Sequence, residues 1–455
     1  MVEDFKGKRV LVLGMARSGL AAVDILLKRG AFVTIADGGS SEQIKETAEK
    51  LKDKGLDIFI GGYPEIKKED FDLLVLSPGI PLDIEPIQAA YRQGVPIIGE
   101  LELAYLIKSP AVRIYAVTGT NGKTTTTALL QAIFEKNGEN SLMGGNIGIP
   151  LTKIMDELEE GVIAAEVSSF QLETIKSFRP DICGILNITP DHLDRHKNMQ
   201  KYIEAKAKIF ANQRAEDFAV LNYDDDLVRN LASLSKAKVI FFSISHILNE
   251  GLFIKKDRIV VRLNGEENEI CRLEDILLKG KHNLENVLCA ASIALLAGVK
   301  GEVIKETLRT FKGVRHRMEE VGIIDGILYV NDSKATNPES ALKALEAYNS
   351  PVILIAGGRN KGADFRNFAR TAKNKVKYLI LLGEAKEEIK QAFIEEDFKF
   401  IYEAFNMREA VMIAKKLAEK GDVVLLSPAC ASWDMFKNYE HRGDCFCALV
   451  KDLAD

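Results

Sequence analysis

Short apolar runs alternate with amphipathic stretches along the first hundred residues. The β-rich runs are "RVLVLG", "AFVTIAD", "DLLVLSPG" and "VPIIG", and the stretches between them that look helical are "GLAAVDILLKRG", "IKETAEKLKDKG" and "EPIQAAYRQG". Strands that alternate with helices in this way form βαβ units around a parallel sheet that is buried on both faces. The pattern predicts one α/β domain over residues 1–109, ending at the proline-containing segment 108–113.

The same rhythm returns twice further along the chain. "RIYAVTG", "GVIAAEVSS" and "DICGILNIT" predict a second parallel sheet, followed by a hairpin-like piece with an Asn-Gly turn and a long apolar helix, "HNLENVLCAASIALLAG". We assign this domain to residues 110–312, with the basic "FKGVRHR" as a hinge. A hairpin, "VGIIDGILYVND", then opens a third α/β domain over residues 313–455. The first and third domains are expected to be Rossmann-like.

The length of the chain fits three domains, and its charge, apolar runs and cysteines exclude several classes of protein. At 455 residues the chain exceeds what one hydrophobic core usually serves. Its 66 acidic and 61 basic side chains give a net charge of −5, which argues against a nucleic-acid partner. We find no signal peptide and no apolar run long enough for a membrane span. The six cysteines form no CxxC pair, so we expect reduced thiols in a cytoplasmic protein that has no membrane partner.

The stretch "AVTGTNGKTTTTALL" carries the strongest chemical signal. A β-rich run, a glycine loop and a helix start are the context of a phosphate-binding loop, although only two residues separate Gly119 from Gly122 instead of four. Backbone N–H groups of such a loop hold phosphate oxygens, Lys123 would neutralise them, and the Thr124 hydroxyl would bind Mg²⁺. The alternative is a Gly-Asn turn that caps a helix. The strand before the loop and the threonines after it favour a nucleotide site in a central P-loop domain.

The first glycine loop, "VLVLGMARSGLA", suggests a different function. Gly14 and Gly19 fit the outer positions of the dinucleotide fingerprint, and Asp37 stands near the place of a ribose-binding acid. That combination would indicate a nicotinamide dehydrogenase. However, Ala16 occupies the position of the second glycine, where a Cβ hinders the approach of a pyrophosphate to the backbone.

"TGTNGKTTT" is the form that this loop takes in the Mur ligases, and the chain resembles that family in further motifs across all three predicted domains. These are "GGNIG", "AAEVSSFQLE", "NITPDHLDRH", "YIEAKAKIF", "KHNLENVLCA", "GVRHRME", "VNDSKATNP", "AGGRNKGADF" and "LLSPACASWDMFKNYEHRG". The resemblance implies an ATP-dependent amide ligase of bacterial cell-wall precursor synthesis that works through an acyl phosphate. "SSFQLE" and "SPACASWDMFKNYEHRGD" resemble the branch that adds D-glutamate to UDP-N-acetylmuramoyl-L-alanine.

The resemblance also implies which residues act on ATP and metal. It implies two Mg²⁺ ions, with Mn²⁺ as an alternative, one between the ATP phosphates and one on a carbamylated lysine, which matches Lys206. The implied catalytic residues are Lys123, Glu166, His192 and Lys206, and the implied metal ligands are Thr124, Glu166, His192 and Lys206. The implied ATP-binding residues are Gly119, Thr120, Asn121, Gly122, Lys123, Thr124, Thr125, Asn283, Asn286, Arg317 and Asp332.

The other two substrates have their own implied contacts. Those for the UDP-linked substrate are Arg17, Ser18, Asp37, Gly38, Gly79 and Asn146, and those for D-glutamate are Lys334, Thr336, Lys361, Ser432 and Trp433. Judged without the resemblance, Glu166 would be a surface charge, Lys206 a solvated helix lysine, and His192 a loop histidine. Trp433 fits a packed core ring as well as a pocket wall. We interpret His196 as a polar loop residue.

Two other classes of protein stay open at this stage. A ligase that adds L-alanine, or a folylpolyglutamate synthase, would bind ATP in the same way; the latter lacks a preceding Rossmann-like domain of this length. A nucleotide-binding protein without enzymatic activity would not need Glu166, His192 and Lys206 together. We expect a monomer that acts on small molecules, with ATP binding completed by domain closure.

Overall fold

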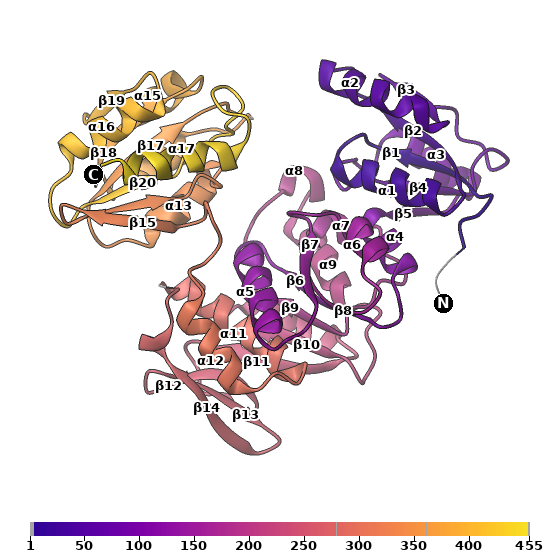
Figure 1. Ribbon diagram of the computed structural model, residues 1–455, viewed down its shortest axis with the longest axis horizontal. Coiled ribbons are helices and arrows are strands. Elements are labelled where there is room, and N and C mark those ends of the chain that lie inside the picture. The colour runs from indigo at the N-terminus through magenta and orange to yellow at the C-terminus, as the bar shows by residue number, and fades with distance from the viewer. Residues whose placement is uncertain (1–3, 279, 361, 454–455) are drawn as a thin grey trace. The chain divides into compact units, whose positions relative to one another are not determined.

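A computed structural model describes residues 4–278, 280–360 and 362–453 of the chain. It divides into two compact units, Met1–Phe311 and Lys312–Asp455 (Figure 1). The first unit contains two sheets and the second unit contains one, each built mainly from parallel strands. The predicted three-domain α/β class is therefore confirmed, while the boundaries placed at residues 109 and 312 stay predictions.

The first sheet is entirely parallel and has the order β3-β2-β1-β4-β5. Because β1 lies between β2 and β4, the loops that follow β1 and β4 open at the point where strand order reverses, which is where α/β sheets bind ligands. The short, largely exposed β3 was not predicted. The strands are β1 (Arg9–Leu13), β2 (Phe32–Asp37), β3 (Asp57–Ile60), β4 (Leu73–Leu76) and β5 (Ile97–Gly99), and the helices are α1 (Arg17–Lys28), α2 (Glu42–Leu51), η1 (Lys52–Lys54) and α3 (Glu85–Gln93).

The second sheet has nine strands in the order β14-β13-β12-β11-β10-β9-β6-β8-β7. The predicted hairpin is confirmed as β12–β13–β14, with positive φ at both residues of the Asn264–Gly265 turn, as a type I′ turn requires. The strands are β6 (Val112–Thr118), β7 (Ser141–Gly145), β8 (Gly161–Glu166), β9 (Ile182–Ile185), β10 (Phe218–Asn222), β11 (Lys238–Ser243), β12 (Gly251–Lys255), β13 (Arg258–Leu263) and β14 (Glu266–Arg272).

Two buried helices, α5 and α11, pack against this sheet and fill one of its cores, as the apolar pattern of α11 predicts. The helices of this part are α4 (Glu100–Ile107), α5 (Lys123–Lys136), α6 (Leu151–Glu157), α7 (Ser169–Glu173), α8 (Leu193–His196), α9 (Met199–Ala207), η2 (Lys208–Phe210), α10 (Asp226–Asn230), η3 (Leu231–Leu234), η4 (Leu273–Asp275), α11 (Lys281–Leu296) and α12 (Gly301–Thr310).

Two buried carboxylates tie α4, which directly follows the first sheet, to the elements around the second. Glu100 accepts hydrogen bonds from the amide and the hydroxyl of Thr152, at the start of α6. Glu102 accepts the backbone N–H groups of residues 176–178 and the hydroxyl of Ser177. Buried carboxylates need such donors. These bonds anchor α4 beside α6 and the segment after α7.

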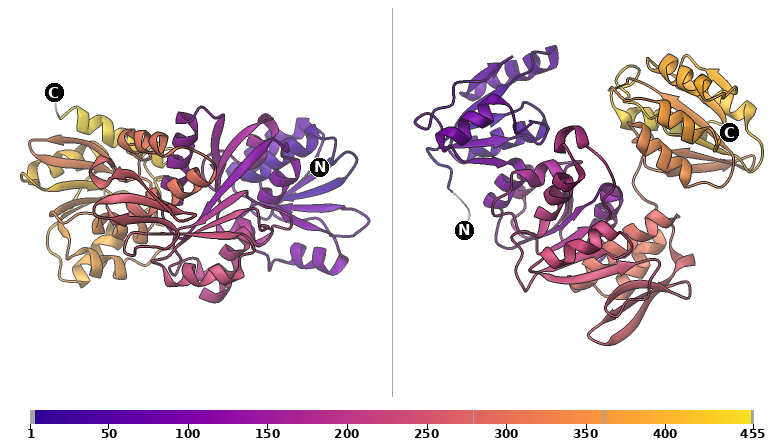
Figure 2. Two further views of the ribbon diagram at one scale, coloured as in Figure 1. Left: turned by 90° about the horizontal axis from the view of Figure 1, so that it is seen from below. Right: turned by 180° about the vertical axis from the view of Figure 1, so that it is seen from behind.

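The second unit is a six-stranded sheet in the order β15-β16-β20-β17-β18-β19, with only β15 antiparallel. Helices cover both faces, and each face has its own apolar core (Figure 2). The hairpin predicted at its start is confirmed as β15–β16. The strands are β15 (Glu319–Ile324), β16 (Ile327–Asn331), β17 (Val352–Gly357), β18 (Val376–Leu382), β19 (Ile401–Glu403) and β20 (Val423–Leu426), and the helices are α13 (Pro338–Glu346), α14 (Arg366–Ala372), α15 (Lys386–Glu395), α16 (Met407–Leu417) and α17 (Tyr439–Lys451).

Two expectations about the whole chain concern its cysteines and its helices. All six cysteines are free thiols, as the composition predicts. Across the described ranges, no helix combines the length and the apolar character that crossing a membrane requires.

Candidate active site

The glycine loop connects the end of β6 to the start of α5, as the sequence predicts. Gly119 and Gly122 have φ angles of +155° and +84°, which favour glycine. A Cβ on Gly122 would lie 2.1 Å from the side-chain oxygen of Asn286. The N-cap residue of α5 is Gly122, which provides no side-chain cap for the helix. This geometry presents a helix N-terminus and close-packed backbone, the arrangement that binds phosphate.

Strand order brings three loops together at this place, because β6 lies between β8 and β9. Glu166 is the last residue of β8, and Asn187 follows β9. The backbone N–H groups of Thr120 and Asn121 donate to the main-chain and side-chain oxygens of Asn187, both at 2.9 Å. Asn187 stood in the quoted motif "NITPDHLDRH", yet it was absent from the predicted site residues. Its position directly after a buried strand was the available signal.

The two residues expected to hold the first metal contact each other. The Thr124 hydroxyl donates to Glu166 Oε2 at 2.7 Å, and the Asn146 amide donates to Glu166 Oε1 at 3.0 Å. Glu166 is only 1% exposed, so its interpretation as a surface charge is wrong. A hydroxyl and a carboxylate are hard oxygen donors of the kind Mg²⁺ prefers. The side chains present therefore fit a Mg²⁺ site at the start of α5.

Lys206 reaches the glycine loop from α9. Its Nζ donates to the main-chain oxygen of Gly119 at 2.8 Å and lies 4.7 Å from the centre of the Tyr202 ring. Burial, and secondly the charge of Lys123, hold the pKa of Lys206 well below its ordinary value. With 1% of the residue exposed, its interpretation as a solvated lysine is wrong. An amine that loses its proton readily fits the expected reaction with CO₂.

Lys123 and His192 have different surroundings from Lys206. Lys123 Nζ donates to the main-chain oxygens of Gly119 and Thr120, both at 2.9 Å, and so folds over the loop. His192 has a half-exposed side chain and a φ of +52°, and its ring lies 4.8 Å from that of Phe170. Within the described residues His192 makes no hydrogen bond with Glu166 or Lys206, and no group of three His, Cys, Asp or Glu side chains is placed to hold a metal.

His196, in contrast, is buried, so its interpretation as a polar loop residue is wrong. It is 4% exposed, and its ring stacks on Phe170 and contacts Tyr202. One ring nitrogen lies 3.0 Å from the Ser169 hydroxyl, and the other lies 3.3 Å from a carboxylate oxygen of Glu173. The segment "NITPDHLDRH" carried no sign of this burial.

Asp37, at the end of β2, organises the first loop of the N-terminal sheet. Its carboxylate accepts the N–H groups of Met15 at 2.8 Å and Gly39 at 2.9 Å. A Cβ on Gly19 would lie 1.9 Å from the main-chain oxygen of Gly14, so packing alone requires that glycine. The dinucleotide-like spacing of Gly14 and Gly19 therefore has a structural cause. Ala16, at the helix start between them, is exposed.

The other predicted contacts of the UDP-linked substrate lie at the start of α1 and on loops of the first unit. Arg17 donates to the main-chain oxygen of Gly148 at 3.3 Å, in the segment "GGNIG" that also carries Asn146. Ser18 lies partly exposed in the first turn of α1, and a Cβ on Gly38 would lie 2.6 Å from the Tyr63 hydroxyl. Gly79, in the loop after β4, is exposed, and its main-chain oxygen accepts from Arg195. Arg195 was not among the predicted site residues.

The remaining predicted ATP contacts divide between the two units. Asn286 donates to the side-chain oxygen of Asn283 at 3.1 Å, at the start of α11. In the second unit, burial raises the pKa of Asp332 to about 6, and its carboxylate accepts from the Ser427 hydroxyl and the Met318 amide. The buried Nε of Arg317 has no hydrogen-bond partner among the described residues. Such an orphaned donor is typical of a group that binds a ligand.

The predicted D-glutamate contacts lie on two loops of the second unit. Lys334 and Thr336, after β16, are partly buried, while Ser432, after β20, is 2% exposed. The buried guanidinium of Arg442 ties these loops together through the oxygens of Ser333, Cys430 and Ala431. Trp433 is 61% exposed, so the core-ring alternative is wrong. Lys361 lies outside the described residues.

Comparison with known families finds matches to all three parts of the chain. Residues 8–99 match the family described as Mur ligase MurD-like, N-terminal domain. Residues 117–294 match the Mur ligase middle domain, and residues 316–430 match the Mur ligase, glutamate ligase domain. The matched ranges include the glycine loop, Glu166 and Lys206 in the middle domain, and Asp332 in the last.

Curated relatives match over the full length. A UDP-N-acetylmuramoylalanine–D-glutamate ligase of Pelotomaculum thermopropionicum is 51% identical over 455 residues, covering 100% of this chain and 99% of the relative. The enzyme of the same name from Clostridioides difficile is 44% identical over 452 residues, covering 99% and 100%. Among solved structures, a UDP-N-acetylmuramate–alanine ligase from Thermotoga maritima superposes with a TM-score of 0.58 at 20% identity, covering 98% and 99% of the two chains. That last likeness concerns the fold alone.

Proposed function

Because the chain belongs to the Mur ligase family, we propose that it is an ATP-dependent ligase that joins D-glutamate to UDP-N-acetylmuramoyl-L-alanine in peptidoglycan precursor synthesis. Full-length identity of 44–51% to enzymes named for this reaction supports the proposal. The single structural observation that carries it is the contact of Thr124 and Glu166 at the start of α5, beside the buried Lys206. Together these side chains provide hard oxygen donors at a phosphate-binding helix start.

In the reaction we propose, the carboxylate of the L-alanyl residue attacks the γ-phosphate of ATP, which forms an acyl phosphate and releases ADP. The amine of D-glutamate then attacks the acyl carbon, loses a proton and displaces phosphate, which forms the amide. Bringing a carboxylate to a phosphate opposes two negative charges, so the site must supply positive charge. Lys123 and the backbone amides at the start of α5 would supply it from this chain, with Gly119, Thr120, Asn121, Gly122 and Thr125 forming the rest of the loop. Bound Mg²⁺ would add further positive charge where Thr124 and Glu166 hold it.

We assign further contacts with ATP, around its adenine, phosphates and ribose, to Asn283 and Asn286 in the first unit and to Arg317 and Asp332 in the second. Asn286 supports this assignment because it packs directly against Gly122 of the loop. The unpartnered Nε of Arg317 and the buried carboxylate of Asp332 support the second pair. Their charges and hydrogen-bonding atoms suit the phosphates and the ribose hydroxyls of a nucleotide.

We also propose that Lys206 is carbamylated and, with Glu166 and His192, holds a second Mg²⁺ or Mn²⁺. Only an unprotonated amine adds to CO₂, and burial beside Lys123 favours that state of Lys206. The carbamate oxygens are again hard donors. His192 would have to turn from its half-exposed position to join them.

We assign the UDP-linked substrate to Arg17, Ser18, Asp37, Gly38 and Gly79, with Asn146 near its reacting end. Arg17 begins α1 after β1, Asp37 ends β2, and Gly79 lies in the loop after β4, so all three lie at the carboxyl edge of the first sheet. Asn146 supports the last assignment because its amide bonds Glu166.

D-Glutamate would be held by Lys334, Thr336, Ser432 and Trp433, with Lys361 as a further predicted contact. Two lysines suit a dicarboxylate, and Arg442 supports the assignment because it holds the loops of Lys334 and Ser432 in one arrangement. We further propose that the enzyme works as a cytoplasmic monomer on these small-molecule substrates.

The test is phosphate release from ATP with UDP-N-acetylmuramoyl-L-alanine, comparing D-glutamate with L-glutamate, L-alanine, L-lysine and diaminopimelate. We expect release with D-glutamate alone. Release with a different amino acid would keep the ligase chemistry and change the substrate. No release with any of them would refute the proposed function.

A further inference from the structure

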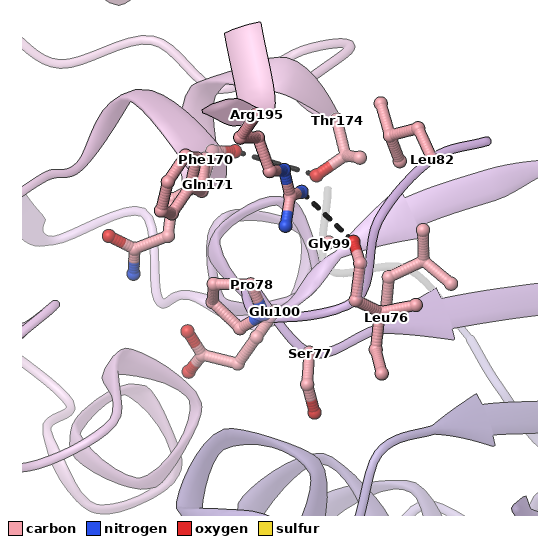
Figure 3. Close-up of a pocket in the computed structure, with 11 residues that line it drawn as sticks. Leu76, Ser77, Pro78, Leu82, Gly99, Glu100, Phe170, Gln171, Thr174 and Arg195 are labelled. Carbon is pink, nitrogen blue, oxygen red and sulfur yellow. Dashed lines mark hydrogen bonds between the residues drawn. The ribbon is translucent and has the colours of Figure 1, made fainter. Parts of the chain in front are cut away.

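Arg195 links two distant segments of the first unit. From α8 its guanidinium donates to the main-chain oxygens of Gly79 at 3.2 Å and Ile80 at 2.9 Å, in the loop after β4. Figure 3 shows this side chain at a small pocket whose walls include Ser77 and Phe170. The bonds span 115 and 116 positions of the sequence and join the two sheets of the unit.

Neighbouring side chains fix the position of the guanidinium. Glu173 accepts from it at 2.9 Å, and the Phe170 ring lies 4.5 Å beneath it. The side chains of Arg195 and Glu173 are only 14% and 16% exposed, so solvent weakens this pair less than it weakens a surface pair. A planar guanidinium can donate to two carbonyls and a carboxylate at once, which the single ammonium of a lysine does less well.

The contacts continue from Arg195 to the glycine loop. Glu173 also pairs with His196, whose ring contacts that of Tyr202. The Tyr202 hydroxyl lies 3.1 Å from the hydroxyl of Thr120 in the loop. A continuous series of polar and aromatic contacts therefore runs from Gly79 to Thr120. Rigid, bonded supports of this kind hold binding groups at a fixed separation.

We propose that Arg195 is a positioning residue for the UDP-linked substrate. It holds the Gly79–Ile80 loop at a set place relative to Glu166 and the glycine loop. A substrate anchored at Gly79 is thereby held at a fixed place relative to the phosphate site. This inference rests on the proposed function, because it takes Gly79 as a contact of the UDP-linked substrate. Arg195 itself acts through the loop and needs no contact with the substrate.

The test compares Arg195→Lys and Arg195→Met with wild type in steady-state kinetics, varying each of the three substrates in turn. We expect the KM for UDP-N-acetylmuramoyl-L-alanine to rise about tenfold in Arg195→Lys and further in Arg195→Met. The KM values for ATP and D-glutamate should change less than about twofold. Arg214→Lys is the matched control, because Arg214 lies in the same unit with 68% of its side chain exposed; its KM values should equal those of wild type.

The possible outcomes distinguish failure of the inference about Arg195 from failure of the proposed function. If wild type lacks D-glutamate-dependent phosphate release, the proposed function fails first. If wild type is active but the Arg195 variants lose only kcat, with all KM values unchanged, Arg195 merely supports folding and the inference is overturned. A uniform rise of all three KM values also overturns it. Should Arg195→Met fail to fold, Glu173→Gln, which keeps the shape and removes the charge, should still raise the KM of the UDP-linked substrate two- to fivefold; an unchanged KM there contradicts the inference.

Discussion

Lys206 Nζ donates a 2.8 Å hydrogen bond to the main-chain oxygen of Gly119, although 87 positions separate the two residues. The bond places a buried amine from α9 under the glycine loop that follows β6. The bond therefore connects the proposed second metal site to the proposed phosphate site. Substitutions at the two sites should differ in whether they affect turnover or ATP binding.

Replacing Lys206 with alanine should abolish turnover while leaving ATP binding largely intact. The substitution removes the proposed carbamate and with it a ligand of the second metal, so we expect kcat to fall by at least about 100-fold. Short-chain carboxylates that occupy the carbamate position should partly restore activity. Lys201→Ala, at an exposed position of the same helix, is the control. Full activity of Lys206→Ala without added acid would contradict the second metal site.

Gly122→Ala should weaken ATP binding, whereas Gly138→Ala should not. Both glycines have a φ of +84°, so alanine is strained at both positions, by about 1–2 kcal/mol. Only at position 122 would the new Cβ meet another atom, the Asn286 oxygen at 2.1 Å; nothing lies within 4 Å at position 138. We expect the KM for ATP to rise at least about tenfold in Gly122→Ala alone. Equal KM values in the two variants would show that the contact with Asn286 is irrelevant.

The stability of the second unit should depend on pH through Asp332. Burial raises the pKa of this carboxyl to about 6, so the folded state holds the proton more tightly than the unfolded state. The stability from this group is present at pH 3 and is lost as the pH rises through about 6. The free energy of unfolding of Asp332→Asn, taken relative to that of wild type, should therefore rise by about 3 kcal/mol between pH 3 and pH 8.

The fluorescence of Trp433, the one tryptophan of the chain, can follow the urea unfolding of this unit at each pH. The Asn side chain loses an acceptor for Ser427, which lowers stability by a similar amount at every pH. The test is therefore how the stability difference between Asp332→Asn and wild type changes with pH. A stability difference that stays constant from pH 3 to pH 8 would mean that Asp332 titrates normally.

D-Glutamate should change the emission of Trp433 in the wild-type enzyme. The indole is 61% exposed and directly follows Ser432, the buried residue assigned to the amino acid. An amino acid bound there would displace water from one face of the ring. Titration with D-glutamate, in the presence of the other substrates, should give a saturable change, and L-glutamate should give none. Saturating turnover without any change in emission would remove Trp433 from the pocket.

The local pattern of apolar and polar residues predicted much of the fold. Alternating apolar and amphipathic stretches predicted the α/β class and three domains, and Asn264–Gly265 predicted a hairpin turn that the structure confirms. The strand β3 was missed because four largely exposed residues give no periodic signal. The glycine loop could be predicted because its chemistry is contiguous in sequence.

The site was harder to predict, because its contacts join residues that are far apart in the sequence. Lys206 and Glu166 look like ordinary surface charges in isolation, and only their similarity to family motifs singled them out. Their burial and their bonds to Gly119 and Thr124 depend on how α9 and β8 pack around β6. Asn187, His196 and Arg195 were missed because their partners are remote in sequence: they lie in the glycine loop, in α7 and in the loop after β4.

The sequence by itself determined most of the elements, the glycine loop and the family to which the chain belongs, because periodicity, turn residues and contiguous motifs are local properties. The tertiary structure alone decided which charges are buried and which side chains meet. Burial and contact depend on the order of strands in the sheets, since that order brings the ends of β6, β8 and β9 to one edge. No local pattern records that order.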